Sequence, residues 1–142
     1  MTPTEIIKTA RGWIGTPYMH QASLKGIGCD CLGLLRGVWR ELYGSEPETP
    51  PPYSGDWAEA TGQEAMIEAA MRHLRPIGCL DFGPGDVILF RWRPDLPAKH
   101  CGIATSAATM VHAHDGAAVA EVGIGSWWRR HIACAFRFPE RG

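Results

Sequence analysis

Apolar residues recur at helical spacing in the first half of the chain and at strand-like intervals in the second half. The helical segments are expected from Thr2 to about Trp13, from Asp30 to Gly44 and from Ala58 to Leu74. The first opens on a capping box with Pro3 at the first helical position, and Asp30 is the expected N-cap of the second. Ser54 or Asp56 is the expected cap of the third. The first half of the chain is therefore expected to be mainly helical.

Two stretches interrupt this helical pattern. Gly15-Thr16-Pro17-Tyr18 breaks the first helix, and the segment that follows to Gly28 holds two more glycines. Ser45 to Gly55 is dense in proline, including Pro50-Pro51-Pro52, which favours an extended backbone and resists packing into a core strand. The first stretch is therefore expected to be a loop and the second an extended connector.

The pattern changes to short β segments from Gly83 onward. These segments run from Asp86 to Trp92, Cys101 to Ser106, Thr109 to His114, Ala118 to Val122 and Arg130 to Phe138. Asp115-Gly116 is a strong hairpin signal between the third and the fourth. Helices followed by strands predict the α+β class, with N-terminal helices packed on a C-terminal antiparallel sheet of about five strands. Residues 1–142 are expected to form a single domain, with a proline-rich connector and an extra helix at about residues 45–75.

Charge and hydropathy argue against several classes of partner. Fourteen Lys and Arg against fifteen Asp and Glu leave a formal net charge of -1, so no bulk field favours nucleic acid or an anionic membrane surface. The longest apolar runs, such as Val87-Ile88-Leu89-Phe90, are too short for a membrane span. The first residues lack the basic start and apolar stretch of a secretory signal. We therefore expect synthesis in the cytoplasm and export only with another carrier.

The chain has five cysteines, and one of them has the position of a nucleophile. The five are Cys29, Cys31, Cys79, Cys101 and Cys134. Their odd number excludes a complete intrachain disulfide framework, and mostly reduced thiols are expected. Cys31 directly follows the capping Asp30, in the first turn of the expected second helix, where the partial positive charge of the helix end favours the nucleophilic thiolate. Cys29 precedes this helix, so a packing or redox role is expected for it.

A catalytic thiol needs a base, and two histidines are spaced to provide one with its orienting partner. His100 begins an expected strand, and His112 lies twelve residues further on in the neighbouring strand. The pairing of these strands can place the two rings side by side, with one as the base and the other fixing its tautomer. His114 lies on the same strand face and is an alternative to His112. Gly102 is expected to leave room beside the base for a substrate backbone.

Five short segments follow one another in an order that indicates a family resemblance. They are Gly15-Thr16-Pro17-Tyr18, Asp30-Cys31-Leu32-Gly33-Leu34, Pro84-Gly85-Asp86-Val87-Ile88-Leu89-Phe90, His100-Cys101-Gly102-Ile103 and Val111-His112-Ala113. In the same order they resemble the G-x-P-Y, D-C-S-G-L, P-G-D-L, H-V-G-I and I-H-A segments of the NlpC/p60 family of papain-like cell-wall cysteine peptidases. The resemblance extends from about Ile6 to Phe138 and implies the papain-like fold of that family.

The resemblance also implies an activity, which is hydrolysis of peptidoglycan stem peptides between γ-D-glutamate and a diamino acid. Position by position, the family's nucleophile, base, third polar residue and oxyanion tyrosine match Cys31, His100, His112 and Tyr18. Asp30 and Trp127 are candidate substrate contacts, and no metal or cofactor is expected. The expected substrate is a peptidoglycan peptide. The compact layout resembles members carried on the tails of phages and phage-like particles, which implies tail proteins as partners and action at the bacterial cell wall.

The nucleophile motif departs from the family pattern at Leu32, where serine is usual, and at Cys29, where an apolar or aromatic residue is common. A zinc site is another interpretation of four residues, Cys29, Cys31, His100 and His112, although Cys-x-Cys is a less usual metal spacing than Cys-x-x-Cys. Tyr18 can instead fill the core. Two further functions stay open on the same scaffold: a non-catalytic tail structural or wall-binding module, and an amidase or acyltransferase.

Overall fold

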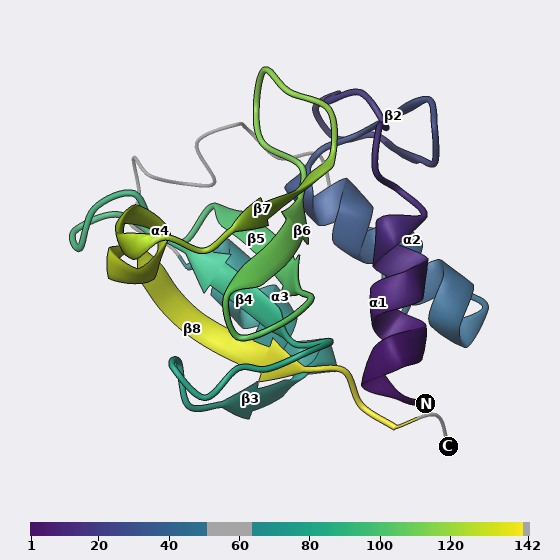
Figure 1. The fold of residues 1–142 in the computed structure, drawn as a ribbon. Helices are drawn as coiled ribbons and strands as arrows, with labels where there is room; N and C mark the ends of the chain where they lie inside the picture. The colour runs from purple at the N-terminus through teal and green to yellow at the C-terminus, as the bar shows by residue number, and fades with distance from the viewer. Residues whose placement is uncertain (51–63, 141–142) are drawn as a thin grey trace.

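The computed structural model describes residues 1–50 and 64–140. Three helices come from the first half of the chain, namely α1 (Pro3–Arg11), α2 (Cys31–Tyr43) and α3 (Ala65–His73). A short strand pair precedes α2, formed by β1 (Ser23–Leu24) and β2 (Gly28–Cys29). The second half supplies β3 (Arg75–Ile77), β4 (Val87–Phe90), β5 (His100–Ala104), β6 (Thr109–His112), β7 (Ala120–Gly123), α4 (Ser126–Arg130) and β8 (Ile132–Arg137). Figure 1 shows the helices beside one curved sheet, which confirms the α+β class.

The main sheet is antiparallel and has the strand order β3-β8-β4-β5-β6-β7. β5 lies near its centre, where Phe90 of β4 is opposite His100 and His112 of β6 is opposite Gly102. Because side chains two residues apart on a strand share a face, this register places His100 and His112 on the same side of the sheet. The fold therefore brings the two histidines together across neighbouring strands.

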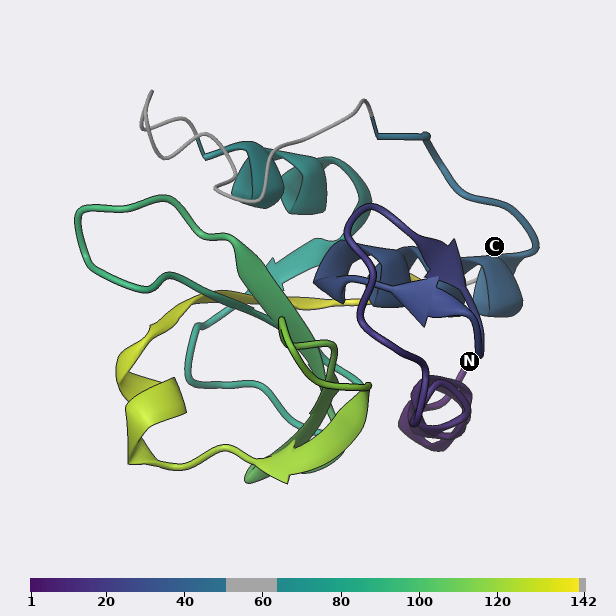
Figure 2. The same cartoon turned by 90° about the horizontal axis from the view of Figure 1, so that it is seen from above.

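Each face of the sheet carries its own apolar core. Val87 and Leu89 of β4 pack with the helices, whereas Ile88 and Phe90 pack in a second cluster on the opposite face. The view from above shows α1, α2 and α3 along one side of the sheet and α4 on the other side (Figure 2). Trp128 of α4 packs against the second cluster. Because strand side chains alternate, α1, α2 and α3 pack on one face of the sheet. The face that carries His100 and His112 packs against α4.

Helices α1 and α2 start where local signals predict, and α2 also ends at its expected glycine. The Thr2 hydroxyl accepts a hydrogen bond from the Glu5 backbone N–H at 3.1 Å, and the Asp30 carboxylate accepts one from the Gly33 backbone N–H at 2.7 Å. Gly44 ends α2 with a φ of 93°, a conformation that glycine adopts without strain. These caps confirm the expected start of both helices and fix Cys31 as the first residue of α2.

The sheet has six strands where about five are expected, and the additional one is β3. The third helix ends at His73, before Pro76 and Gly78 as expected, and Pro76 itself lies within β3. Among the strands of residues 1–50 and 64–140, β3 pairs only with β8, and an edge strand accepts proline because its outer N–H positions need no partner. The expected loop after Tyr18 is also more ordered than predicted, since it contains β1 and β2.

Two other features differ from the sequence expectation. Arg130 ends helix α4 instead of opening the last strand, which begins at Ile132. Asp115 and Gly116 do form a turn, but it lies inside a longer connection, residues 113–119, between β6 and β7. The third helix is described from Ala65 onward. Its expected start and caps, with most of the proline-rich connector, fall within residues 51–63 and lie outside the described residues. No helix of the described residues is long and apolar enough to cross a membrane.

The Pro84-Gly85-Asp86 segment is a structural junction. The Asp86 side chain is buried and its carboxylate accepts two hydrogen bonds from Arg137 of β8, both at 3.0 Å. The same carboxylate accepts a hydrogen bond from the Gly83 backbone N–H at 2.9 Å. A bidentate pair of this kind fixes direction as well as distance. Asp86 therefore ties the start of β4 to β8 and lies outside the cleft described below.

Close contact between α1 and α2 depends on Gly37. A Cβ at this position would lie 2.0 Å from the Cζ2 atom of Trp13, which is fully buried. The Trp13 indole also donates a hydrogen bond to Glu41 of α2 at 2.6 Å, so the ring has little freedom to move. The absence of a side chain at Gly37 therefore lets α1 pack directly on the helix that carries Cys31.

We predict that Gly37→Ala destabilises the protein by about 1–3 kcal/mol, although alanine alone favours a helix. The added methyl group overlaps the Trp13 ring, and overpacking outweighs helix propensity. Thermal unfolding checks this, with Gly123→Ala as the matched control because a Cβ there meets nothing within 4 Å. Equal melting temperatures of Gly37→Ala and wild type would contradict the packing argument.

Candidate active site

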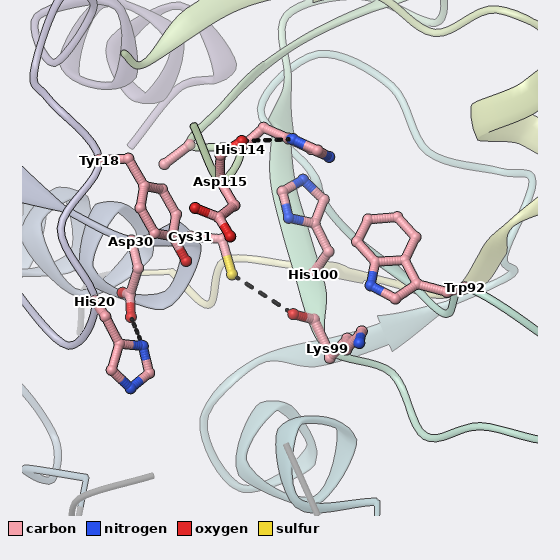
Figure 3. A pocket seen from close by; sticks show the side chains of 10 residues that line it. Tyr18, His20, Asp30, Cys31, Trp92, Lys99, His100, His114 and Asp115 are labelled. Atoms are coloured by element: carbon pink, nitrogen blue, oxygen red, sulfur yellow. Dashed lines mark hydrogen bonds and ion pairs between the residues drawn. The ribbon is translucent and has the colours of Figure 1, made fainter. Parts of the chain in front are cut away.

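Cys31 occupies the first turn of α2 and faces a cleft. Its side chain is directed into the cleft beside the His100 ring (Figure 3). The thiol lies 3.8 Å from the backbone oxygen of Lys99, to which it can donate a weak hydrogen bond. The first N–H groups of a helix have no partner within the helix, so the N–H groups around Cys31 point toward the same region. A thiol and backbone donors thus meet at one end of α2.

Asp30 joins the start of α2 to the preceding loop. One carboxylate oxygen accepts from the Gly33 N–H and the other from the Gln21 N–H, both at 2.7 Å. Gln21 has a positive φ of 64°, which is uncommon outside glycine and is held here by that hydrogen bond. His20 Nδ1 lies 3.8 Å from the second oxygen. Asp30 lines the cleft, and these contacts indicate that it positions the loop.

Gly33 explains how closely this loop approaches the helix. A Cβ on Gly33 would lie 1.8 Å from the backbone oxygen of Ala22, and two atoms cannot approach this closely. The Ser23 hydroxyl donates to the Gly33 carbonyl at 2.6 Å, which adds a second attachment of the loop. The glycine of the Asp30-Cys31-Leu32-Gly33 segment is therefore required by packing of the loop on α2.

His100 and His112 form a hydrogen-bonded pair. His100 Nε2 and His112 Nδ1 are 2.9 Å apart, and both side chains are buried. Gly102, opposite His112 in the sheet, makes this approach possible because a Cβ there would lie 2.8 Å from Met110 Sδ and 3.4 Å from His112 Cβ. The space beside Gly102 is filled by these side chains, so the expected room for a substrate backbone at this position is wrong.

Burial keeps both imidazoles neutral at neutral pH. Burial lowers the pKa of His100 well below its ordinary value, and the nearby charges of His112 and His114 act in the same direction. Burial and the charge of His114 lower the pKa of His112 to about 4. Each neutral ring carries a single proton, so the 2.9 Å hydrogen bond has one donor and one acceptor.

This pairing determines which His100 nitrogen can act as a base. If His100 donates from Nε2 to His112 Nδ1, its Nδ1 carries a lone pair and can accept the Cys31 proton. If His112 is protonated, its Nδ1 must donate instead, and the neutral His100 then carries its proton on Nδ1. His100 is therefore competent as a base only while His112 is neutral, and the pKa of His112 near 4 keeps it so at neutral pH.

His114 lies near this pair without replacing His112. Its ring centroid is 5.4 Å from that of His100 and 5.7 Å from that of His112. His114 follows the end of β6, and its Nδ1 lies 3.4 Å from the backbone oxygen of Asp115. The hydrogen bond to His100 is made by His112, so the alternative in which His114 orients the base does not fit the geometry.

Tyr18 lies next to Cys31 because its segment pairs with β2. The Cys29 N–H donates to Pro17 O and the Met19 N–H donates to Cys29 O, both at 3.0 Å. Burial, followed by the nearby charges of Cys31 and Asp30, raises the pKa of Tyr18 to about 12. The phenol therefore stays protonated and can donate a hydrogen bond. Its side chain is partly exposed and lines the cleft, so Tyr18 does not serve only to fill the core.

The cleft has a volume of about 350 Å³, in the range of ligand pockets. Its walls are formed by Tyr18, His20, Asp30, Cys31, Trp92, Lys99, His100, Ala113, His114 and Asp115. His112 lies behind His100 and does not line it. Trp127 does not line the cleft either; its indole is 46% exposed and stacks on His131 at 4.0 Å. The expected Trp127 contact with substrate is therefore not supported by the geometry.

Three side chains of this region are absent from the sequence expectation of the site. Trp92 lies stacked 5.5 Å from His100, and Trp128 lies stacked 5.4 Å from it. Lys99 places its ammonium group 6.0 Å from the Trp92 ring centre, at the cleft wall. Trp92 and Lys99 lie on either side of the β4–β5 connection, and no motif indicates that their side chains meet there. Their roles depend on contacts between distant segments.

All five cysteines are thiols. Cys29 is fully buried, and burial raises its pKa to about 12, which agrees with packing and argues against a metal ligand or nucleophile. Cys101 donates a hydrogen bond to the backbone oxygen of Cys31 at 3.3 Å and so supports the start of α2. Among residues 1–50 and 64–140, no group of three or more His, Cys, Asp and Glu is arranged to hold a metal ion.

Comparisons with known proteins identify the fold. No protein-family model and no curated protein matches the chain. Solved structures do match. The NlpC/p60 domain of peptidoglycan hydrolase SagA matches with a TM-score of 0.67 and 20% sequence identity, and the match spans 97% of this chain and 100% of that domain. An NLP/P60 family protein similar to lipoprotein from Staphylococcus aureus matches at 0.68 and 18%, and an NlpC/P60 family protein from Bacillus cereus at 0.66 and 18%.

These two bacterial proteins are much longer than the matched region. The match with the Staphylococcus aureus protein spans 98% of this chain but 42% of that protein. The match with the Bacillus cereus protein spans 97% of this chain but 40% of that protein. At 18–20% identity the likeness concerns the backbone arrangement. The protein therefore has the papain-like fold of NlpC/p60 domains.

We predict that Cys31 reacts with iodoacetamide at pH 6 at least about 10-fold faster than Cys79, because the helix N-terminus stabilises negative charge that develops on the sulfur and His100 can take the thiol proton as the bond forms. Cys79 is exposed and serves as the internal comparison. Burial raises the pKa of Cys29 to about 12 and that of Cys134 to about 11, and the hydrogen bond with Cys31 together with burial raises the pKa of Cys101, so these three thiols should react more slowly than Cys79. Peptide mass spectrometry gives the site-resolved rates.

His100→Ala is the matched variant for this experiment. It should slow the labelling of Cys31 and leave the rate of Cys79 unchanged. Equal rates at Cys31 and Cys79 in the wild type would contradict activation of the thiol at this site.

Proposed function

We propose that the protein is a cysteine endopeptidase that hydrolyses peptidoglycan stem peptides between γ-D-glutamate and a diamino acid. The observation that carries the proposal is the arrangement of Cys31 at the start of α2, facing His100, whose second ring nitrogen is hydrogen-bonded to His112 at 2.9 Å. Nucleophile, base and orienting residue are the three parts that thiol hydrolysis needs. The substrate class is supported by the fold shared with the SagA peptidoglycan hydrolase domain.

In the first half of the proposed reaction, Cys31 attacks the carbonyl carbon of the scissile amide. His100 Nδ1 takes the thiol proton, and the imidazolium keeps its Nε2 hydrogen bond to His112. The tetrahedral intermediate then collapses, and His100 returns the proton to the leaving amine nitrogen. The products of this half are a thioester on Cys31 and the diamino acid portion of the peptide with a free amine.

Negative charge on the carbonyl oxygen needs hydrogen-bond donors in the cleft. The Cys31 backbone N–H is available at the first turn of α2, where the helix dipole also favours an anion. The Tyr18 phenol is a second donor, since its pKa of about 12 keeps it protonated. One such donor contributes roughly 2.7–4 kcal/mol to transition-state stabilisation.

In the second half, water replaces the amine. His100 accepts a proton from the water as its oxygen attacks the thioester carbonyl, and the thiolate of Cys31 leaves. Transfer of that proton from the imidazolium to the thiolate restores the resting enzyme. Release of the γ-glutamyl carboxylate completes one hydrolysis. The neutral state of His100, favoured by its lowered pKa, is the form required at the start of both halves.

The setting that we propose is the tail of a phage or phage-like particle, where the peptidase would act locally on the cell wall. This part of the proposal is supported by the motif resemblance of the sequence. A non-catalytic wall-binding module on the same fold does not need the buried hydrogen bond between His100 and His112. An amidase or acyltransferase would use the same thiol but release a different product.

We predict that Cys31→Ala abolishes cleavage of purified muropeptides, by at least about 1,000-fold, because the thioester cannot form. Cys79→Ala is the matched control; it removes an exposed thiol outside the cleft and should keep wild-type turnover. Mass spectrometry of the products should show fragments separated at the γ-glutamyl bond. Equal turnover by wild type and Cys31→Ala would sink the proposal, and a peptide released intact from its sugar would indicate an amidase.

We predict that His112→Asn keeps much more activity than His112→Ala, because an amide oxygen can accept the His100 Nε2 hydrogen bond and a methyl group cannot. His112→Ala should lose roughly 100-fold or more in kcat. The wild type should keep its activity below pH 6.5 and lose it as pH falls toward 4, where His112 takes a proton. Steady-state kinetics across pH measures both effects.

In His112→Asn this titration is absent, so the acidic limb of kcat should move to lower pH. Thermal unfolding of each variant at pH 7 separates loss of catalysis from loss of folding. Similar kcat values for His112→Asn and His112→Ala would show that His112 does not act as a hydrogen-bond acceptor for the base.

A further inference from the structure

The histidine pair is covered by a side chain that comes from outside the motifs. The Trp128 indole lies 5.4 Å from His100, nearly parallel at 27°, and 5.3 Å from His112, at 89°. One ring therefore contacts both members of the pair at once. Trp128 belongs to α4, whereas the histidines belong to β5 and β6, so the contact joins three separate segments.

The indole is itself held by aromatic neighbours. Phe90, which is fully buried, meets Trp128 edge to face at 4.9 Å. Trp92 lies 5.9 Å away from Trp128 and stacks on His100 at 5.5 Å. Contacts of this geometry are favourable beyond the area that they bury. Trp128 consequently has a defined position over the two histidines.

Trp128 is more exposed to solvent than the histidine pair that it packs against. It is partly exposed, while His100 is 4% and His112 is 6% exposed. Water that reached the pair would compete for the single proton that the two rings share. A buried hydrogen bond is stronger than the same bond in contact with water. The position of the indole suits a cover for this bond.

We propose that Trp128 is a positioning residue, which excludes water from the hydrogen bond between His100 and His112 and thereby keeps His100 Nδ1 unprotonated toward Cys31. This inference rests on the proposed function for its effect on turnover. Its effect on the histidines themselves is independent of any substrate.

Several titratable or charged groups lie near the Trp128 indole and the histidine pair. Cys31, Lys99, His114 and Asp115 line the cleft in front of the pair, and Arg129 and Arg130 follow Trp128 in α4. Burial is the largest cause of the lowered pKa of both His100 and His112, ahead of the neighbouring charges. Removal of the indole leaves these charges in place and admits water, so the pKa of His112 rises toward its ordinary value near 6.5.

Three variants test the role of Trp128. Trp128→Leu removes the aromatic cover, Trp128→Phe keeps part of it, and Trp39→Phe is the control. Trp39 is a partly buried tryptophan of α2 that stacks on Tyr43 at 4.2 Å, in the helical layer. Muropeptide kinetics should show kcat reduced about 10-fold in Trp128→Leu with KM within twofold, an intermediate value in Trp128→Phe and wild-type values in Trp39→Phe.

The acidic limb of kcat should shift upward by at least one pH unit in Trp128→Leu, which a loss of stability alone does not cause. NMR titration of the histidine rings in substrate-free protein provides the independent readout, with the pKa of His112 raised in Trp128→Leu and less so in Trp128→Phe. If Trp128→Leu fails to fold, the comparison of Trp128→Phe with Trp39→Phe decides.

An unchanged pKa of His112 in a folded Trp128 variant overturns the inference, whether or not the enzyme cleaves peptides. A wild type without peptidase activity but with the predicted change in His112 titration overturns the proposed function and leaves this inference standing. A reduced kcat with an unmoved acidic limb shows a purely structural role and also overturns it.

Discussion

The hydrogen bond between His100 and His112 imposes the main constraint on the site. Two neutral imidazoles share one proton across 2.9 Å, so the tautomer of each ring depends on that of the other. Only the arrangement in which His100 donates from Nε2 leaves Nδ1 able to take a proton from Cys31. Burial on both sides of this bond keeps the pair neutral. The β5–β6 register, the side-chain space at Gly102 and the cover by Trp128 all serve this one bond.

Cys31 belongs to the helical layer and the histidines belong to the sheet, so packing between the two layers must place the thiol beside the pair. Gly37 lets α1 pack against α2, and Gly33 lets the loop with Tyr18 approach the start of that helix. Asp30 then links helix and loop through two hydrogen bonds, while Cys101 of β5 donates to the backbone of Cys31. Cys31 is thus attached to β5, the strand that carries His100, by a hydrogen bond from the Cys101 side chain to its own backbone, which limits relative movement of Cys31 and His100.

The sequence predicted the parts of this site that depend on local signals. The cap at Asp30, the start of α2 at Cys31 and the closeness of His100 to His112 follow from neighbouring residues or from one strand pairing. It did not predict the place of Trp128, because no helix was expected where α4 lies and the contact of Trp128 with the histidines joins segments far apart in the chain. The sequence did not predict edge strand β3, because a proline such as Pro76 usually indicates the end of a helix and seldom lies within a strand.

Imidazole nitrogen-15 NMR of the resting protein at pH 7 tests the central claim most directly, because chemical shifts distinguish the two neutral tautomers from the imidazolium. The account predicts that His100 and His112 are both neutral and both carry their proton on Nε2. A His100 ring protonated on Nδ1, or a pair that shares a positive charge at this pH, would contradict the claim that His112 prepares His100 to take the proton of Cys31.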